Sequence, residues 1–407
     1  MPEINNTRKR AHKARDKPAA LGPDISLDKY SAQAEEHGRI KKLKELSVDV
    51  REKAIGAGVD ANESYRSGSF FQIDHSVIQS SANQNGIEVM SVTEALKKYD
   101  WLKDYWWKNV AVDMDKYTAQ AELKSNHGYF IRALPGVKVQ FPVQACLFID
   151  KDGLAQNVHN IIIAEEGSEL HIITGCTTAH NVKNGLHIGI SEFYVKKNAH
   201  ISFTMIHNWA KDVVVRPRTG TIIEENGVFL SNYICMKPVR DLQMYPTAYC
   251  AGKNATVRYN TILYASEGSN MDVGSRVFLK AKGSKAELIA RAISKGGNIM
   301  ARGHLIGEVP EVKAHLECRG LILSEGGKIH AIPELEGLRE GVDLSHEAAV
   351  GKIAEEEIHY LMARGLNEEE SAAVIIRGFL DVDIKGLPQH LQDEMKRIME
   401  SSERQLL

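Results

Sequence analysis

A charged turn containing glycine or asparagine recurs through the middle of this chain and limits what it can fold into. Turns marked by Gly167, Lys197, Gly227, Gly252 and Gly283 are 30, 30, 25 and 31 residues apart. Apolar and polar residues alternate on both sides of each turn, as in half-buried β-strands. No long helix fits between the turns, so parallel strands joined by crossover helices are disfavoured. A period near 30 residues instead predicts a β-solenoid.

In such a solenoid over residues 140–335, each coil stacks on the last. Inward-facing Leu170, Ile172, Val257 and Leu288 then build one continuous core. An ordinary β-sandwich is the alternative, with turns every 8–12 residues and no repeating theme of strand, turn and strand.

The flanking regions have a different character. Residues 1–22 are polar and basic and are expected to be a disordered tail, and residues 23–139 are expected to be mainly helical. The segment from Ser91 to Tyr105 opens with a capping box and ends in aromatic residues that we interpret as core packing. Residues 336–407 are expected to form a helical C-terminal subdomain, including a last helix over about 388–403.

Composition narrows the function class. The 407 residues carry a formal charge of −2, which removes the electrostatic case for nucleic acid as a partner. The sequence contains no run of 18 apolar residues, so no membrane-spanning helix is expected, and the polar N-terminus does not resemble a signal peptide. Five cysteines without any CxxC favour a reducing cytoplasm. No nucleotide-binding loop is present, so ATP hydrolysis by this chain is not expected.

Cys318 is the strongest candidate for chemistry. Alternation in its strand places it on the inner face, where an inert buried thiol is the simpler interpretation. His346 and Glu347 follow 28 and 29 residues later, about one coil further on. A thiolate, an imidazole and a carboxylate together suit iron. Adjacent strand residues point to opposite faces, so one of His346 and Glu347 is expected to serve a partner subunit.

Six histidines in the predicted solenoid have no assigned role, because a lone histidine is more often a surface or packed residue than a ligand. They are His159, His171, His180, His187, His200 and His207.

Several segments resemble the SufB/SufD family, whose members are scaffold proteins of iron–sulfur cluster assembly. The resemblance is carried by residues 344–353 (LSHEAAVGKI), 357–361 (EIHYL), 363–366 (ARGL), 171–176 (HIITGC), 206–209 (IHNW) and 317–323 (ECRGLIL). It spans about residues 85–400. It implies a mainly β fold, a right-handed parallel β-helix with helical parts at both ends.

The resemblance also implies a function and partners. Cys318 would receive sulfur and ligate iron, with His346 and Glu347 completing the coordination of a transient iron–sulfur cluster across a dimer. The implied partners are a SufC-like ABC-type ATPase bound through the C-terminal helices, a second copy or a SufB/SufD paralogue, a sulfur donor and apo iron–sulfur proteins. ATPase activity is expected in the partner, so the chain itself is expected to be a scaffold and not an enzyme.

Individual residues indicate which branch of the family the chain resembles, and two other functions compete with this interpretation. Glu347 is typical of the SufB branch, because SufD proteins usually carry glycine there. Ser345 replaces the usual SufB glutamate, and the Cys-rich N-terminal motif of some SufB proteins is missing, which suggests a compact scaffold that pairs with itself. A carbohydrate-active β-helix enzyme and a Cys-dependent acyl-transfer enzyme using Cys318 are the alternatives.

Overall fold

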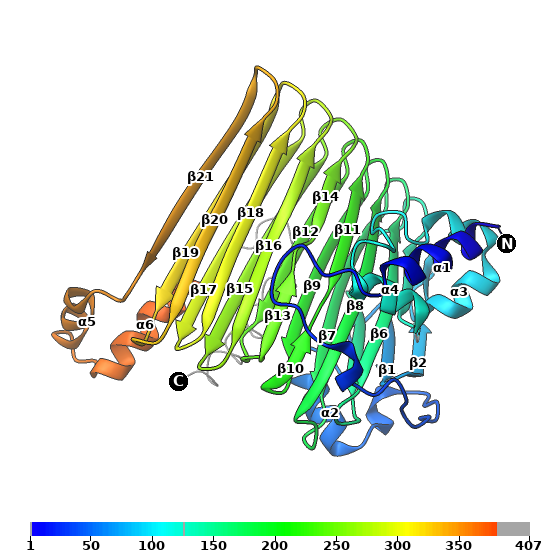
Figure 1. The fold of residues 1–407 in the computed structure, drawn as a ribbon, viewed down its shortest axis with the longest axis horizontal. Coiled ribbons are helices and arrows are strands. Elements are labelled where there is room, and N and C mark those ends of the chain that lie inside the picture. Colours follow the sequence, from blue (N-terminus) through cyan, green and yellow to red (C-terminus); the bar gives the residue numbers. More distant parts are fainter. Residues whose placement is uncertain (1, 125–126, 381–407) are drawn as a thin grey trace.

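The computed structural model describes residues 2–124 and 127–380, and these form a β-solenoid with helices near both ends (Figure 1). The expected last helix over 388–403 lies outside the described residues. Two sheets of stacked strands make the solenoid wall. No helix within the described ranges is both long enough and apolar enough to cross a membrane.

We call the two sheets sheet I and sheet II, and give their strands in spatial order. Sheet I contains β2 (Ser76–Ala82), β1 (Gly68–Ile73), β5 (Val143–Ile149), β7 (Glu169–Thr178), β9 (His200–Asn208), β12 (Val228–Cys235), β15 (Thr256–Ser266), β17 (Lys285–Lys295), β19 (Val312–Ile322) and β21 (Val342–Gly351). Sheet II contains β10 (Asp212–Val215), β13 (Asp241–Met244), β16 (Asn270–Leu279), β14 (Thr247–Cys250), β11 (Arg218–Ile223), β8 (Asn184–Val195), β6 (Ala155–Ala164), β4 (Tyr129–Ala133) and β3 (Ile87–Ser91), while β18 (Asn298–Gly307) pairs with β16 and β20 (Lys328–Gly337) with β18. Apart from the hairpin β1–β2 and the pair β3–β4, these neighbouring strands run parallel.

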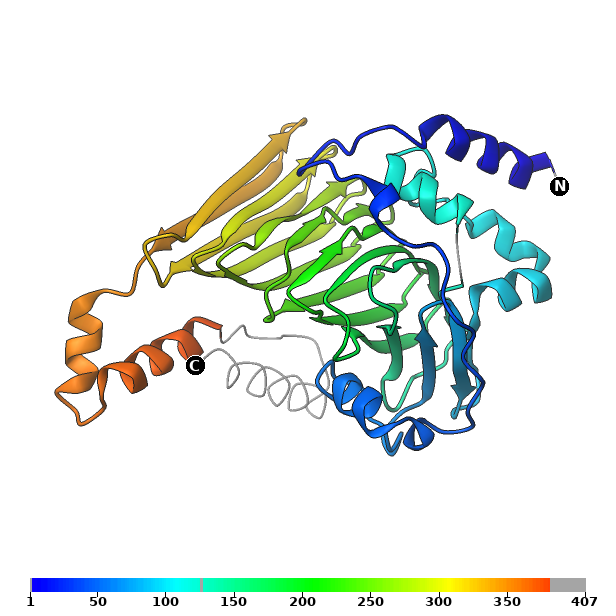
Figure 2. The same ribbon diagram turned by 60° about the horizontal axis from the view of Figure 1, so that its bottom comes forward.

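The helices lie outside the wall. They are α1 (Pro2–Ala14), α2 (Val48–Ile55), α3 (Val92–Lys98), α4 (Lys116–Leu123), α5 (Glu355–Met362) and α6 (Glu368–Leu380), with short 3-10 helices η1 (Leu27–Lys29), η2 (Leu43–Glu45) and η3 (Asp100–Tyr105). Helices α1 to α4 gather around the early coils, whereas α5 and α6 extend from the last coil (Figure 2).

The recurring turns explain why the coils stack in register. Asn198, Asn226 and Asn254 occupy the left-handed region, at φ of 56°, 54° and 58°. Asparagine tolerates this conformation better than most residues. The Asn226 amide donates to Asn198 Oδ1 at 2.9 Å, and the Asn254 amide to Asn226 Oδ1 at 3.0 Å. This ladder of side chains aligns successive coils, and it confirms the solenoid over the sandwich.

The core runs along the inside of the wall. Leu170, Ile172, Val257 and Leu288 all belong to one buried cluster that extends as far as Cys318. The predicted inward face is therefore confirmed. The predicted aromatic packing is also confirmed, since Trp106 stacks on buried His159 with ring centroids 3.9 Å apart.

Three expected boundaries differ from the structure. Residues 2–14, within the expected disordered tail 1–22, form α1, because Ala11 and Ala14 pack against α4 and Arg10 pairs with Asp113 at 2.6 Å. The expected helical region 23–139 supplies β1 to β4 to the wall. The solenoid expected to end at 335 continues through β20 and β21 to Gly351, so the helical part of 336–407 begins only at Glu355.

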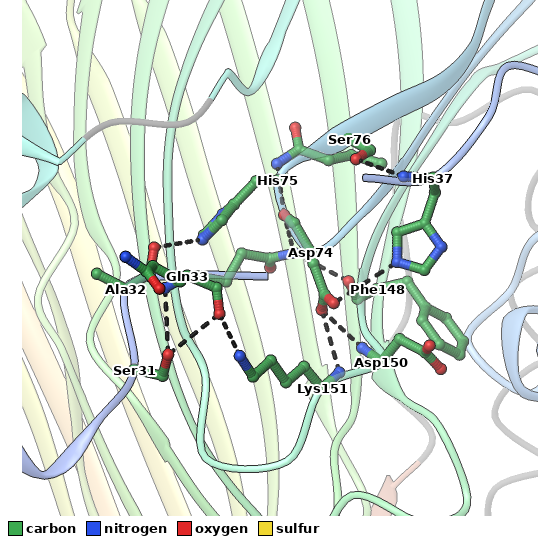
Figure 3. Close-up of polar contacts among 12 residues, drawn as sticks. Ser31, Ala32, Gln33, His37, Asp74, His75, Ser76, Phe148, Asp150 and Lys151 are labelled. Atoms are coloured by element: carbon green, nitrogen blue, oxygen red, sulfur yellow. Dashed lines mark hydrogen bonds and ion pairs between the residues drawn. The ribbon is translucent and has the colours of Figure 1, made fainter. Parts of the chain in front are cut away.

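A strap over residues 31–40 crosses the early coils and ties them together (Figure 3). His75 in the β1–β2 turn contacts the carbonyl of Ala32 through Nε2 at 3.1 Å. Lys151, after β5, donates from Nζ to the carbonyl of Gln33 at 2.6 Å. The strap therefore fixes the N-terminal end of the solenoid. At the other end, which we call the open end, no described strand pairs with the outer edges of β20 and β21.

Candidate functional site

Cys318 lies on β19 with its side chain turned into the solenoid. Burial along the strand alternates, and Leu316 and Cys318 are 3% and 4% exposed while Arg319 is open to solvent. Burial raises the pKa of the Cys318 thiol to about 11, with a smaller lowering effect from Arg291 and a raising effect from Glu317. The thiol is therefore protonated and weakly nucleophilic at neutral pH.

The last strand of sheet I brings His346 to the same face. The register pairs His346 with Leu316 and Ala348 with Cys318, so His346 is a diagonal neighbour of Cys318. Unlike Cys318, His346 is exposed, because β21 has only β19 as a neighbour among the described strands. An imidazole and a thiol thus share one face at the open end of the solenoid.

Glu347 points to the other side of the sheet. It pairs in register with Glu317 on the outer face, and its Oε1 is 3.2 Å from Nη2 of Arg319. The structure therefore brings together two of the three residues predicted from the sequence. The opposite orientation of His346 and Glu347 follows from strand alternation, as expected.

The space beside Cys318 is small. A cavity of about 20 Å³ is lined by Cys318 together with Ala290, Ala301 and Gly303. That volume holds about one water-sized atom. An iron–sulfur cluster does not fit there, so any cluster bound to Cys318 requires this end of the solenoid to open or to lie against another surface.

A second polar region occupies the interior of the early coils. His207 contacts the Tyr233 hydroxyl through Nδ1 at 2.7 Å, and His187 contacts Gln156. Burial lowers the pKa of His187 to about 3 and also lowers the pKa of His207, so both imidazoles are neutral. Cys176 pairs in register with His207. These side chains are packed, as the sequence suggested for the solenoid histidines.

Alternation along the strand predicts that Glu317 and Arg319 lie on the outer face behind Cys318, but sequence reasoning missed their partners on the neighbouring coils. Arg291 and Arg319 pair in register, as do Glu317 and Glu347. The only available signal was their separation by 28 and 30 residues, which matches the coil period. Within the described residues, no group of three or more His, Cys, Asp and Glu side chains is arranged to hold a metal ion in a single chain.

The geometry disfavours the two enzyme alternatives. An acyl-transfer nucleophile needs an activated thiolate, and burial works against one at Cys318. Glu317 and Glu347 face each other in register, but both carboxylates form ion pairs with Arg319, whereas the carboxylate pair of a sugar-cleaving enzyme must act on the substrate. The fold and site instead define a parallel β-helix protein with a thiol and an imidazole at its open end.

Comparison with known proteins gives the family. Residues 147–379 match the family described as SUF system FeS cluster assembly, SufBD core domain. The chain is similar to an iron–sulfur cluster assembly SufBD family protein of Methanothermobacter thermautotrophicus, at 51% identity over 98% of this chain and 99% of the relative. A SufBD family protein of Archaeoglobus fulgidus is 54% identical over 89% of this chain and 97% of its own length. SufB of Bacillus subtilis is 29% identical over 87% and 78%. The chain belongs to the SufBD family of iron–sulfur cluster assembly proteins.

Proposed function

We propose that this chain is a scaffold on which iron–sulfur clusters are assembled and handed to recipient proteins. The observation that carries the proposal is that Cys318 and His346 are diagonal neighbours on one face at the open end of the solenoid. Cys318 receives sulfur and ligates iron, and His346 and Glu347 complete the coordination across a dimer, because Glu347 of the same chain faces the other side of the sheet. The chain itself is not an enzyme, and the ATPase activity resides in a SufC-like partner.

The chemistry of these donors suits an iron–sulfur cargo. Thiolate is the usual ligand of iron–sulfur clusters, and imidazole replaces it in some. Two donors from one chain leave iron positions open for sulfide and for ligands from a second chain. The buried, protonated Cys318 also implies a resting state in which the site is closed.

A second chain fits at the free strand edges. Among the described strands, β20 and β21 each have one neighbour, so each presents an unpaired edge. Such edges favour pairing with another sheet. Exposed Val350, and Leu338 in the β20–β21 connection, add apolar surface at this end. We propose that a second copy or a SufB/SufD paralogue binds here.

The helical hairpin of α5 and α6 is the proposed docking surface for the ATPase. Ile376, Phe379 and Leu380 of α6 pack on the outer face of sheet I. Tyr360 and Val374, by contrast, are 57% and 45% exposed. The first turns of both helices hold six glutamates, so the hairpin fits a partner surface that is basic and partly apolar.

The remaining partners and the location follow from the same role. A sulfur donor must load Cys318, and apo iron–sulfur proteins must accept the finished cluster. All five cysteines are free thiols in the structure. Free thiols are typical of a reducing compartment, so we place the protein in the cytoplasm.

Replacing Cys318 tests the proposed function directly. Anaerobic reconstitution with iron and sulfide should give a thiolate-to-iron absorption band in the wild type. Cys318→Ser should lose most of this band, because serine removes the soft sulfur donor. Cys250→Ser is the matched control, since Cys250 is also fully buried but lies on sheet II. If Cys318→Ser binds as much iron and sulfide as wild type while the control does not, the assignment of the site is wrong.

Substitutions on the hairpin test the two protein partners. The double variant Tyr360→Ala/Val374→Ala removes exposed apolar contacts and should reduce co-purification with the ATPase about tenfold or more. It should still sediment at about twice 45.2 kDa, because the strand edges are unchanged. Val48→Ala on α2, also an exposed apolar site, is the control. If co-purification of the double variant is undiminished, the ATPase binds elsewhere on the chain. If the protein stays monomeric with the ATPase present, the proposed dimer is refuted.

A further inference from the structure

A row of isoleucines on the outer face of sheet I is buried although it points away from the solenoid core. Ile206 on β9, Ile234 on β12 and Ile262 on β15 are neighbours in register, and they are 2%, 1% and 4% exposed. The residues that follow two of them, Cys235 and Leu263, belong to the inner core, whereas the isoleucines belong to a separate cluster. We call the three residues the isoleucine stripe. An outward-facing side chain that is this well buried needs another part of the molecule over it.

Helical segments flank the stripe on both sides. In the row of the stripe, the next residue is Gly175 on β7, and a Cβ there would lie 2.5 Å from the carbonyl oxygen of Ala57, just after α2. On the other side, α6 packs Ile376, Phe379 and Leu380 against the cluster. Figure 2 shows α2 and α6 on the same side of the wall with the middle coils between them. Within the described part of the chain, helical cover in this cluster comes from the end of α6 alone.

The chain itself continues from the edge of this surface. Leu380 is 1% exposed and belongs to the same cluster as the stripe. Residues 381–407, which lie outside the described residues, follow it directly. A helix over 388–403, as the sequence predicts, would be about 24 Å long. The four strand-to-strand steps from β7 to β17 span about 19 Å, so one such helix is long enough to cross the stripe.

The apolar residues of this segment have the spacing that a helix lying on a sheet needs. Leu391, Met395 and Ile398 recur at i, i+4 and i+7, which places them on one side of the predicted helix. We propose that residues 381–407 bind the isoleucine stripe of their own chain through this apolar face. Because the segment is tethered at α6, its effective concentration at the stripe exceeds that of a second copy in dilute solution. The stripe is then closed by the chain's own end and is not a docking surface for a partner protein.

Hydrogen exchange of the full chain, followed by mass spectrometry over 388–403, tests the proposal. A helix bound to the stripe should be protected in the isolated wild type, because exchange requires it to open. Leu391→Asp and Met395→Asp, made separately, should each speed this exchange about tenfold or more, because a carboxylate is costly to bury without a partner. Gln389→Asp is the matched control, since it adds the same charge on the opposite side of the predicted helix.

A substitution on the sheet tests the other half of the contact. Ile234→Ala should speed exchange over 388–403 several-fold, because it shortens the surface that the segment binds. Ile332→Ala on β20 is its control, since Ile332 is also half-buried or better but belongs to sheet II. Thermal melts of every variant establish that each is folded.

Three results would overturn the proposal. The first is exchange over 388–403 in wild type that is as fast as in the Asp variants. The second is an unchanged rate in a folded Ile234→Ala, which would place the segment elsewhere. The third is protection that disappears on dilution or appears only when the ATPase is added, which would assign the stripe to a second copy or to the partner. None of these results involves iron or Cys318, so they are distinct from a failure of the proposed function.

Discussion

Alkylation of Cys318 should accelerate about tenfold for each pH unit between pH 7 and pH 10, without reaching a plateau. The thiolate is the reactive form, and burial raises the pKa of Cys318 to about 11. An ordinary thiol has a pKa near 8.5, so its rate levels off above about pH 9. Over three pH units the expected rise is on the order of 1000-fold. Short pulses of alkylating agent followed by peptide mass spectrometry would measure it at each cysteine.

The other cysteines provide the internal control. Burial raises the pKa of Cys235 and Cys250 to about 12 and also raises those of Cys146 and Cys176. Cys318 should therefore be the first cysteine modified in the folded protein. A plateau below pH 9 at Cys318 would mean that the thiol is not held in the buried state.

The same measurement tests how the site opens. We propose that ATP binding draws two ATPase subunits together, and that they pull on the α5–α6 hairpins and shift the solenoid ends. An opening from 1:99 to 99:1 requires roughly 5 kcal/mol of preference for the open state. In the complex, a non-hydrolysable ATP analogue should speed labelling of Cys318 at pH 7. Equal rates with and without nucleotide would rule out nucleotide-gated exposure and leave the scaffold proposal intact.

The sequence predicts the solenoid because its turns demand particular residues. Asn198, Asn226 and Asn254 each adopt positive φ, and their spacing sets the coil length. Strand alternation, a local property, also predicts that Cys318 is buried and that His346 and Glu347 point apart. These expectations needed no knowledge of how distant segments meet.

The sequence alone does not predict features that depend on the register between neighbouring coils. The contact between Arg319 and Glu347 exists because Glu317 and Glu347 align, and one residue more in the β20–β21 connection would separate them. The sequence predicts helix over the region that contains β1 to β4, because these strands are short and lie between helical segments. Their place in the wall comes from pairing with β5 and β6, which is a tertiary effect.

Glu192 is the clearest case of a structural residue that the sequence did not reveal. It lies on β8, is fully buried, and its carboxylate accepts backbone N–H groups from Trp107 and Asn109 at 2.8 and 2.5 Å. It also contacts His159 Nε2 at 2.8 Å and accepts from the backbone of Val110 at 3.2 Å. One side chain therefore fastens the aromatic segment after η3 to sheet II.

Glu192→Ala should lower the free energy of unfolding by about 3–5 kcal/mol, because it leaves several buried donors without an acceptor. Glu192→Gln keeps one carbonyl oxygen and should cost about half as much or less. Denaturant midpoints of the two variants and wild type, at equal m-values, give the comparison. Losses below 1 kcal/mol for alanine would mean that water replaces the carboxylate.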